Sequence, residues 1–303
     1  MAVTRRQFVS AAGAAGALSG QSETASNHRF TKGICRVIFP SAMPLEGCFR
    51  AARNAGFEAI ELTMTGDLDP SVAADRVKRT HEQALKAGIA IAALWVTPLA
   101  QYPLNSPDAR VRGQGVESIR KAIEFAGYLN CRALLVVPGR VGSLNGELIG
   151  YEASWERFTA ELKKLVPLAE QARVVLAIEN VSNKFLLSPR DKRTFVDQFN
   201  TSWVRSFFDI GNVMYTGYPE DWILTLGSRI ARVHAKDRKN TPKAEFESPS
   251  GLLEGDVDWK SVISALVKVG YRGSISAEIG PKPDDPDHLK KVSAAMDTIL
   301  AMA

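Results

Sequence analysis

Four side chains that could bind a metal ion or move a proton stand at the ends of apolar, β-rich runs in the second half of this 303-residue chain. They are Glu179, Asp209, His234 and Glu278, and their intervals of 30, 25 and 44 residues suit successive strand–helix units. Three carboxylates held close together repel one another unless a cation neutralises them. Oxygen and imidazole donors without thiolates favour one divalent ion, Mn²⁺ before Mg²⁺, Co²⁺ or Zn²⁺.

Each of these residues also has an ordinary structural explanation. Asp209 could cap a helix N-terminus, His234 could serve only to hold the fold by hydrogen bonds, and a glutamate at a strand end could face solvent. Four such residues on consecutive strands favour a shared site instead. Glu61 ends a further apolar run, so we expect it either to support the ligands or to contact the substrate.

The elements that would position these residues repeat one unit. From residue 32 onward, an apolar or β-branched run is followed by an amphipathic helix. The eight expected strands are Gly33–Phe39, Ala59–Thr63, Ala90–Val96, Ala133–Pro138, Val174–Glu179, Ser206–Ile210, Ile230–His234 and Ser274–Glu278. Such units close into a (β/α)8 TIM barrel, whose chemistry lies at the carboxyl ends of the strands. The alternative, an open doubly wound sheet, would place a glycine-rich turn after the first strand, and Cys35–Pro40 contains no glycine.

At these strand ends the sequence resembles the sugar isomerase/epimerase family of xylose isomerase-like TIM barrels, which includes the D-tagatose, D-psicose and L-ribulose-5-phosphate 3-epimerases. The resemblance covers residues 32–303. It is carried by Ile178-Glu179-Asn180, Asp209-Ile210-Gly211-Asn212, His234-Ala235-Lys236-Asp237, Glu254-Gly255-Asp256-Val257-Asp258-Trp259 and Ala277-Glu278. The second and fourth motifs are most similar to the ribulose-phosphate epimerase branch. Free-ketose epimerases have a histidine where this chain has Asn212, so the substrate does not follow from the resemblance.

The resemblance implies that the four strand-end residues bind one divalent metal and that Glu179 and Glu278 also move a proton. A proton next to a carbonyl is weakly acidic, and a metal would stabilise the enediolate that forms when the proton leaves. With one glutamate on each face, removal on one side and return on the other would epimerise or isomerise a ketose or keto-sugar. Lys236 and Asp237 are expected to organise this site, or else to form a surface ion pair.

Other functions would use some of the same features. A metal-dependent lyase or hydrolase of 3-keto-glycosides would remove the same proton and expel a leaving group. A non-catalytic periplasmic sugar-binding barrel would not need two opposed glutamates. DNA cleavage by three zinc ions, as in endonuclease IV of the same superfamily, would need more histidines than the four in this chain. The net charge of +5 comes from scattered basic residues, so we expect no nucleic-acid partner.

Loops are expected to supply further substrate contacts. The segment Arg238–Leu253, after the seventh strand, is the candidate lid, and Arg238 or Lys239 could bind an anion there. Arg140, on the loop after the fourth strand, is a second candidate. The expected substrate-binding residues are therefore Glu61, Asn212, Lys236, Asp237, Arg238 and Arg140.

Residues 1–26 are expected to form an export signal and a short linker, followed by a single barrel domain over 27–303. Thr4-Arg5-Arg6-Gln7-Phe8 precedes an apolar run, Val9–Leu18, that is rich in alanine and glycine. The paired arginines resemble the twin-arginine pattern, so we expect the twin-arginine translocase to carry the folded protein to the periplasm. Export argues against a sugar phosphate as substrate, because such metabolites are largely confined to the cytoplasm.

The composition is that of a globular protein, with 45% hydrophobic and 23% charged residues. No run reaches the ~18 consecutive apolar residues of a membrane-spanning helix. Cys35, Cys48 and Cys131 fit no metal-binding spacing and are expected to be buried, with a Cys35–Cys48 disulfide as the alternative. The family resemblance implies a homodimer or a homotetramer as the assembly.

Overall fold

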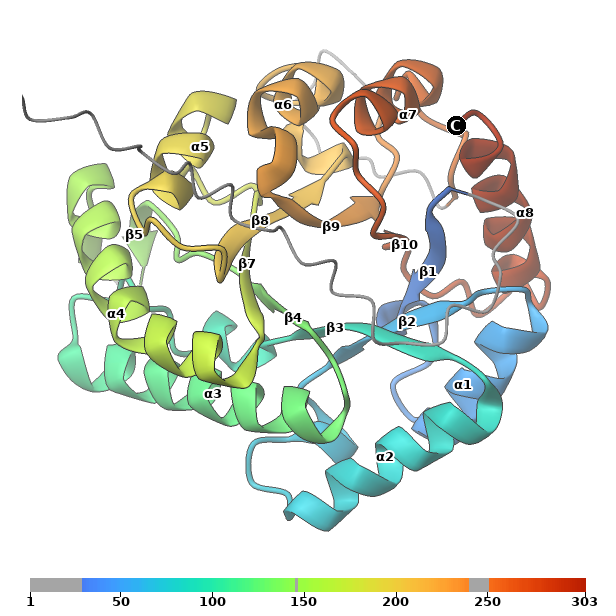
Figure 1. Cartoon of the computed structure of the whole chain (residues 1–303), viewed down its shortest axis with the longest axis horizontal. Coiled ribbons are helices and arrows are strands. Elements are labelled where there is room, and N and C mark those ends of the chain that lie inside the picture. Colours follow the sequence, from blue (N-terminus) through green and yellow to red (C-terminus); the bar gives the residue numbers. More distant parts are fainter. Residues whose placement is uncertain (1–28, 145–146, 240–250) are drawn as a thin grey trace, which may run out of the picture.

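The computed structural model describes residues 29–144, 147–239 and 251–303. In this part of the chain, eight parallel strands close into a barrel in the order β1-β10-β9-β8-β7-β4-β3-β2, with helices around it (Figure 1). The expected (β/α)8 TIM barrel is confirmed, and the open doubly wound sheet is wrong. The barrel strands are β1 (Thr31–Cys35), β2 (Ala59–Thr63), β3 (Ala90–Trp95), β4 (Ala133–Val136), β7 (Val175–Glu179), β8 (Val204–Asp209), β9 (Ile230–Ala235) and β10 (Ser274–Ala277). The helices are α1 (Leu45–Asn54), α2 (Ala74–Ala87), α3 (Ala109–Tyr128), α4 (Tyr151–Ala172), α5 (Pro189–Asp197), α6 (Pro219–Leu226), α7 (Trp259–Lys268) and α8 (His288–Leu300).

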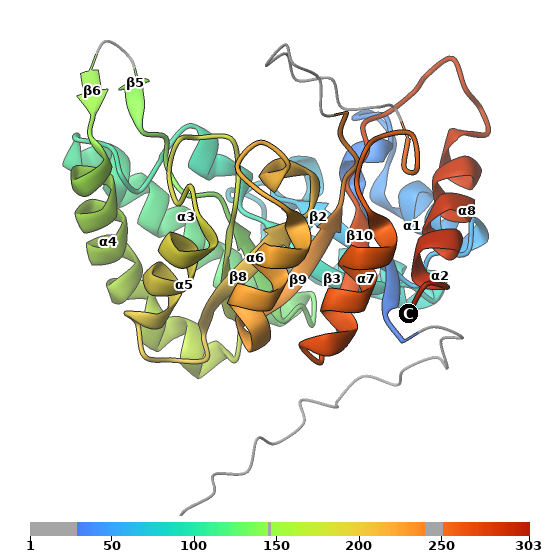
Figure 2. The same ribbon diagram turned by 90° about the horizontal axis from the view of Figure 1, so that it is seen from above.

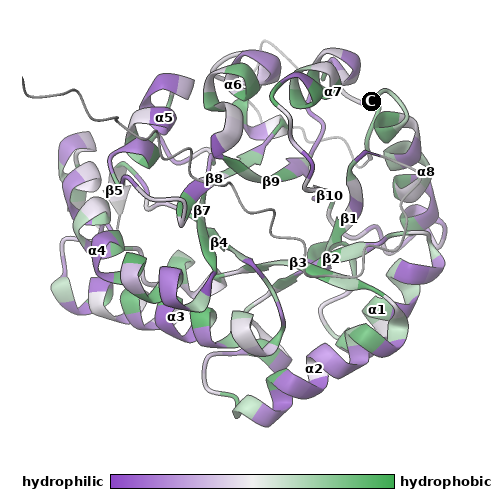
Figure 3. Cartoon of the chain, in the orientation of Figure 1, coloured by the Kyte–Doolittle hydropathy of each residue, from purple (hydrophilic) through white to green (hydrophobic). Residues whose placement is uncertain are grey.

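Two apolar clusters hold the strands in place. Strand residues that point inward form the smaller one, and most of them are alanines: Ala93, Ala133, Leu135, Ala177, Phe207 and Ala231. The larger cluster lies between the barrel and the helices, which turn hydrophobic stripes inward and hydrophilic ones outward (Figure 3). Each large apolar side chain that is fully buried there contributes about 1.5–3 kcal/mol. Packing in this layer holds each strand at a defined position along the barrel axis. It thereby positions the side chains at the strand ends, which form the barrel mouth.

The first strand ends four residues earlier than expected, at Cys35, and residues 36–38 form a 3₁₀ turn. The guanidinium of Arg36 explains the difference, because it donates hydrogen bonds to the carbonyl oxygens of Phe39, Pro40, Ser41 and Met43 and so folds the chain back on itself. The antiparallel hairpin of β5 (Gly142–Leu144) and β6 (Glu147–Ile149) was not expected either. Figure 2 shows it projecting beyond the barrel beside α4.

All three cysteines are free and buried, so the expected burial is confirmed and the Cys35–Cys48 disulfide is wrong. The expected export signal, residues 1–26, lies outside the described residues, as do residues 240–250 of the expected lid. Within the described ranges, none of the helices combines the length and apolar character that a membrane crossing requires.

Candidate metal centre

The carboxyl ends of four neighbouring strands, β7 to β10, meet along one arc of the barrel mouth. Glu179 and Asp209 end β7 and β8, His234 is the penultimate residue of β9, and Glu278 directly follows β10. The Nδ1 atom of His234 lies 3.2 Å from Glu179 Oε1, 3.2 Å from Glu278 Oε2 and 3.8 Å from Asp209 Oδ2. The fold therefore brings all four strand-end residues into one cluster, with a donor atom of each within 4.8 Å of the others.

Asp209 uses one carboxylate oxygen in the fold and presents the other to the cluster. Its Oδ1 accepts a hydrogen bond from the backbone N of Asn212 at 2.7 Å. Asn180 clamps the backbone of Asp209, since its Nδ2 donates to Asp209 O at 2.8 Å and its Oδ1 accepts from Asp209 N at 3.1 Å. Within the described residues, the buried Oδ2 has no hydrogen-bond partner, but the ammonium group of Lys236 lies 3.2 Å from it. Oδ2 thus faces the cluster and is placed to interact with a cation.

The charges in the cluster push the pKa values of the two glutamates in opposite directions. Burial raises the pKa of Glu179, opposed by His234 and reinforced by the charges of Glu278 and Asp209. Burial also acts to raise the pKa of Glu278, but His234 and Lys236 outweigh it and hold this pKa well below the ordinary value. Two carboxyl groups with separated pKa values can divide the roles of acid and base between them.

Lys236 and Asp237 are neighbours in sequence but serve different contacts. Lys236 Nζ lies in the cluster, 3.2 Å from Asp209 Oδ2 and 2.5 Å from Glu278 Oε2. Burial lowers the pKa of Lys236, but Asp209 and Glu278 outweigh this effect and raise it above the ordinary value. The buried Asp237 accepts hydrogen bonds from the backbone N of Gly255 at 3.0 Å and from the indole Nε1 of Trp259 at 3.3 Å. It therefore holds the turn that leads into α7.

Glu61 lies on the other side of the imidazole. Its Oε2 is 2.9 Å from Nε2 of His234, the nitrogen that does not face the three carboxylates. Only 4% of Glu61 is exposed, which places it in the barrel interior, in contact with a residue of the cluster. Burial lowers the pKa of His234, but the charges of Cys35, Glu61 and Glu278 outweigh it and raise this pKa well above the ordinary value.

The remaining expected substrate contacts lie around the cluster. The Asn212 side chain donates to Asn180 O at 3.1 Å and accepts from Arg238 Nη2 at 3.1 Å. The Arg238 guanidinium is buried and also lies over the ring of Tyr215, 5.2 Å from its centroid. Arg140 is exposed on the loop between β4 and β5, and it is not part of the cluster.

Two buried polar residues near the cluster received no role from the sequence. Asn180 stands beside Glu179, and only the folded turn reveals that it holds Asp209. Lys192 lies in α5, fully buried, with its Nζ donating to the carbonyl oxygen of Ile178 at 2.6 Å. The helical spacing indicates that Lys192 is buried, because it lies on the same face of the helix as the apolar residues Phe195 and Val196.

Burial lowers the pKa of Lys192 to about 7, although Glu179 acts to raise it. Because the unfolded chain keeps the ordinary, higher value, it binds more protons than the folded protein between about pH 7 and 10.5, and stability rises with pH across that window. We predict that Lys192→Met stabilises the protein most below pH 7, with a benefit that shrinks by roughly 2–3 kcal/mol by pH 9.5. Urea unfolding at several pH values measures this. The exposed Lys86→Met is the control, and equal pH slopes for Lys192→Met and wild type would contradict the assignment.

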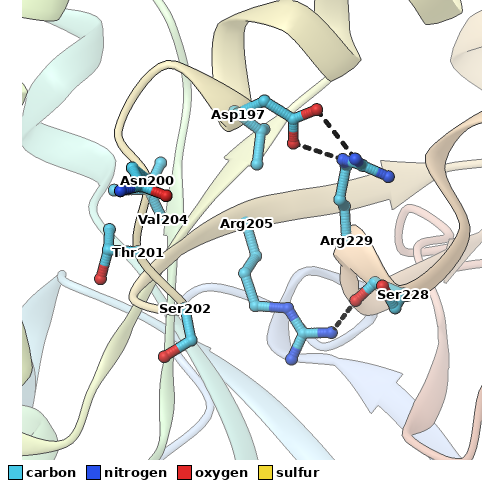
Figure 4. A pocket seen from close by; sticks show the side chains of 9 residues that line it. Asp197, Asn200, Thr201, Ser202, Val204, Arg205, Ser228 and Arg229 are labelled. Atoms are coloured by element: carbon cyan, nitrogen blue, oxygen red, sulfur yellow. Dashed lines mark hydrogen bonds and ion pairs between the residues drawn. The ribbon is translucent and has the colours of Figure 1, made fainter. Parts of the chain in front are cut away.

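A cavity of about 690 Å³ lies at the opposite end of the barrel from the cluster. Figure 4 shows its side chains around the start of β8. Its two arginines are engaged within the protein, Arg229 with Asp197 and Arg205 with the carbonyl oxygen of Ser228. Chemistry in TIM barrels lies at the carboxyl ends of the strands, so we place the functional site at the cluster.

Comparison with known proteins identifies the family of the barrel. Residues 49–299 match the family described as xylose isomerase-like TIM barrel. L-Ribulose-5-phosphate 3-epimerase UlaE of Salmonella paratyphi C (strain RKS4594) is 28% identical over 262 residues, covering 80% of this chain and 86% of that protein. A crystal structure of D-psicose 3-epimerase in the presence of D-fructose has a TM-score of 0.76 at 15% identity, covering 89% of this chain and 98% of the other. The apo form of 3-keto-D-glucoside 4-epimerase, YcjR, from E. coli has a TM-score of 0.72 at 14% identity, covering 89% and 99%. Because the family matches most of the barrel, the chain belongs to the xylose isomerase-like TIM barrels.

Proposed function

We propose that this protein is a divalent-metal-dependent sugar epimerase or isomerase that removes and returns a proton next to a carbonyl group. The observation that carries the proposal is the convergence of two glutamates, one aspartate and one histidine at the barrel mouth, with a donor atom of each within 4.8 Å of the others. The similarity to L-ribulose-5-phosphate 3-epimerase over most of both chains supports the same class of reaction.

The donor set fits a divalent ion. Glu179, Asp209 and Glu278 offer carboxylate oxygens and His234 offers Nδ1, a combination suited to Mn²⁺, Mg²⁺, Co²⁺ or Zn²⁺. The buried Oδ2 of Asp209 faces the cluster and lies 3.2 Å from the Lys236 ammonium, a position that suits a positive charge. When bound, the ion would stabilise the negative charge that develops on the carbonyl oxygen of the sugar.

Glu179 and Glu278 would move the proton. They come from β7 and β10, at the two ends of the arc, so a planar enediolate held between them would present one face to each. Each glutamate would be the base for the epimer whose proton faces it and the acid that returns a proton on its own face for the other epimer. Lys236 Nζ, 2.5 Å from Glu278 Oε2, is placed to hold that carboxylate in its charged state.

We propose an unphosphorylated ketose or keto-glycoside as the substrate. The predicted export signal supports this class, because sugar phosphates are largely confined to the cytoplasm. The Arg238 guanidinium, a candidate phosphate ligand, is already in contact with Asn212 and Tyr215. Similarity to a ribulose-phosphate epimerase favours a phosphorylated sugar, so an experiment must include both kinds.

Metal-loaded protein incubated in D₂O with free ketoses, 3-keto-glucosides and L-ribulose 5-phosphate tests the proposal. We expect solvent deuterium at the carbon next to the carbonyl, together with the epimer or isomer, for at least one unphosphorylated sugar. The reaction should stop when a chelator removes the metal. Exchange with an eliminated product would indicate a lyase instead, and binding without any exchange would indicate a sugar-binding protein.

A further inference from the structure

The imidazole of His234 is held from both sides by carboxylates. Its Nδ1 faces Glu179, Asp209 and Glu278, whereas its Nε2 is 2.9 Å from Oε2 of Glu61. Glu61 comes from β2, and two strands, β1 and β10, stand between β2 and β9 in the barrel. The contact therefore joins the four-ligand arc to a strand that carries none of the ligands.

The surroundings of this contact leave few other partners for Nε2. Glu61 and His234 are 4% and 1% exposed, so water does not compete for the hydrogen bond. The thiol sulfur of Cys35, on β1, lies 3.5 Å from Nε2 and 3.7 Å from Glu61 Oε2. Cys35 lies beside Glu61 in the register of β1 and β2, which places the sulfur over the contact. Glu61 Oε2 is thus the nearest strong acceptor for a proton on Nε2.

A neutral imidazole carries one ring proton, and only the other nitrogen can bind a metal. If the proton is on Nε2 and is donated to Glu61, the lone pair of Nδ1 is directed at the three carboxylate ligands. If the proton moves to Nδ1, the imidazole is lost as a ligand. A carboxylate behind a metal-binding histidine fixes the tautomer and the ring orientation in this way.

We propose that Glu61 is a positioning residue that keeps the ring proton of His234 on Nε2 and so makes Nδ1 the metal ligand. The proposal rests on the proposed function, since it needs a metal at the cluster. It assigns Glu61 a role in metal affinity and no contact with the sugar. Loss of such a supporting group typically costs about 10–100-fold in metal affinity.

Binding of Mn²⁺ measured by titration calorimetry, without any sugar, tests the proposal. Glu61→Met fills a similar volume without an acceptor, and we expect about 10–100-fold weaker binding. Glu61→Gln restores an acceptor oxygen, and its affinity should return most of the way to wild type. Cys35→Ala removes the other neighbour of Nε2 and serves as the matched control, with an affinity within about threefold of wild type.

Long-range ¹H–¹⁵N spectra of Zn²⁺-loaded, histidine-labelled protein provide a second measurement that needs no Glu61 variant to fold. The signal of His234, identified by its loss in His234→Gln, should show the proton on Nε2 and the metal on Nδ1. The proposal is overturned if Zn²⁺ is on Nε2, or if Glu61→Met binds Mn²⁺ as tightly as wild type. If the wild-type protein binds no divalent ion, both the proposed function and the proposed role of Glu61 fail. If wild type binds the ion and Glu61→Met binds it equally well, only the role of Glu61 fails.

Discussion

Glu278→Gln is expected to lower epimerisation by about 10²–10⁴-fold, the usual cost of losing a general base, while the protein keeps its metal. Glutamine retains the shape of the side chain and one ligand oxygen, but it cannot accept the proton. Because Glu179 remains, the variant should still exchange solvent deuterium into the epimer whose proton faces β7. Mass spectrometry of each epimer after incubation in D₂O measures this.

Glu179→Gln should give the mirror image, with exchange into the other epimer only. The pair of variants controls for nonspecific damage, because each is expected to lose a different half of the reaction. Exchange into both epimers by one variant would point to a single mobile base. If both variants keep their metal and neither exchanges either epimer, the assignment of two bases is wrong.

His234→Ala is expected to lose tight metal binding and, with it, activity by roughly 10³-fold or more, since a bound metal supplies several kcal/mol of charge stabilisation. Removal of the imidazole leaves the buried carboxylates of Glu179 and Asp209 and the partly buried one of Glu278, which repel one another. Elemental analysis after dialysis should give one divalent ion per wild-type chain and much less for the variant. His81→Ala, a histidine of α2, is the control and should keep its metal.

Two results would contradict this expectation. Three ions per wild-type chain would indicate a multinuclear centre, and a wild-type chain that stays metal-free after loading with Mn²⁺, Co²⁺ and Zn²⁺ in turn would remove the metal from the proposal. A His234→Ala variant that retains full occupancy would show that the imidazole is not a ligand.

The barrel and its four-residue arc could be predicted because both depend on periodic signals. Apolar runs and amphipathic helices alternate along the chain, and a polar residue at a strand end must lie at the barrel mouth. The end of β1 could not be predicted, since it depends on the hydrogen bonds of the Arg36 side chain to four carbonyl groups. The role of Asn180 depends on the backbone of another strand and has no periodic signature.

The role of Glu61 could not be decided from the sequence either. Its place in the second apolar run predicted a position near the four-residue cluster, and the sequence left open whether it supports the ligands or contacts the sugar. That choice depends on which nitrogen of His234 it faces, which is a property of side-chain packing across β1 and β10. The burial of Lys192 was also not predicted. A charged residue is normally assigned to the exposed side of a helix, although the spacing places Lys192 on the apolar face.

The four residues of the metal centre all fall within residues 179–278, on β7 to β10. The first four strands supply the opposite wall of the mouth, from which Cys35 and Glu61 contact His234. The cluster is therefore encoded by one contiguous part of the gene, and the β5–β6 hairpin lies before it. A crossover between relatives anywhere before residue 179 would transfer all four residues together. Glu61, which contacts His234 from β2, would then come from the other parent and would have to match.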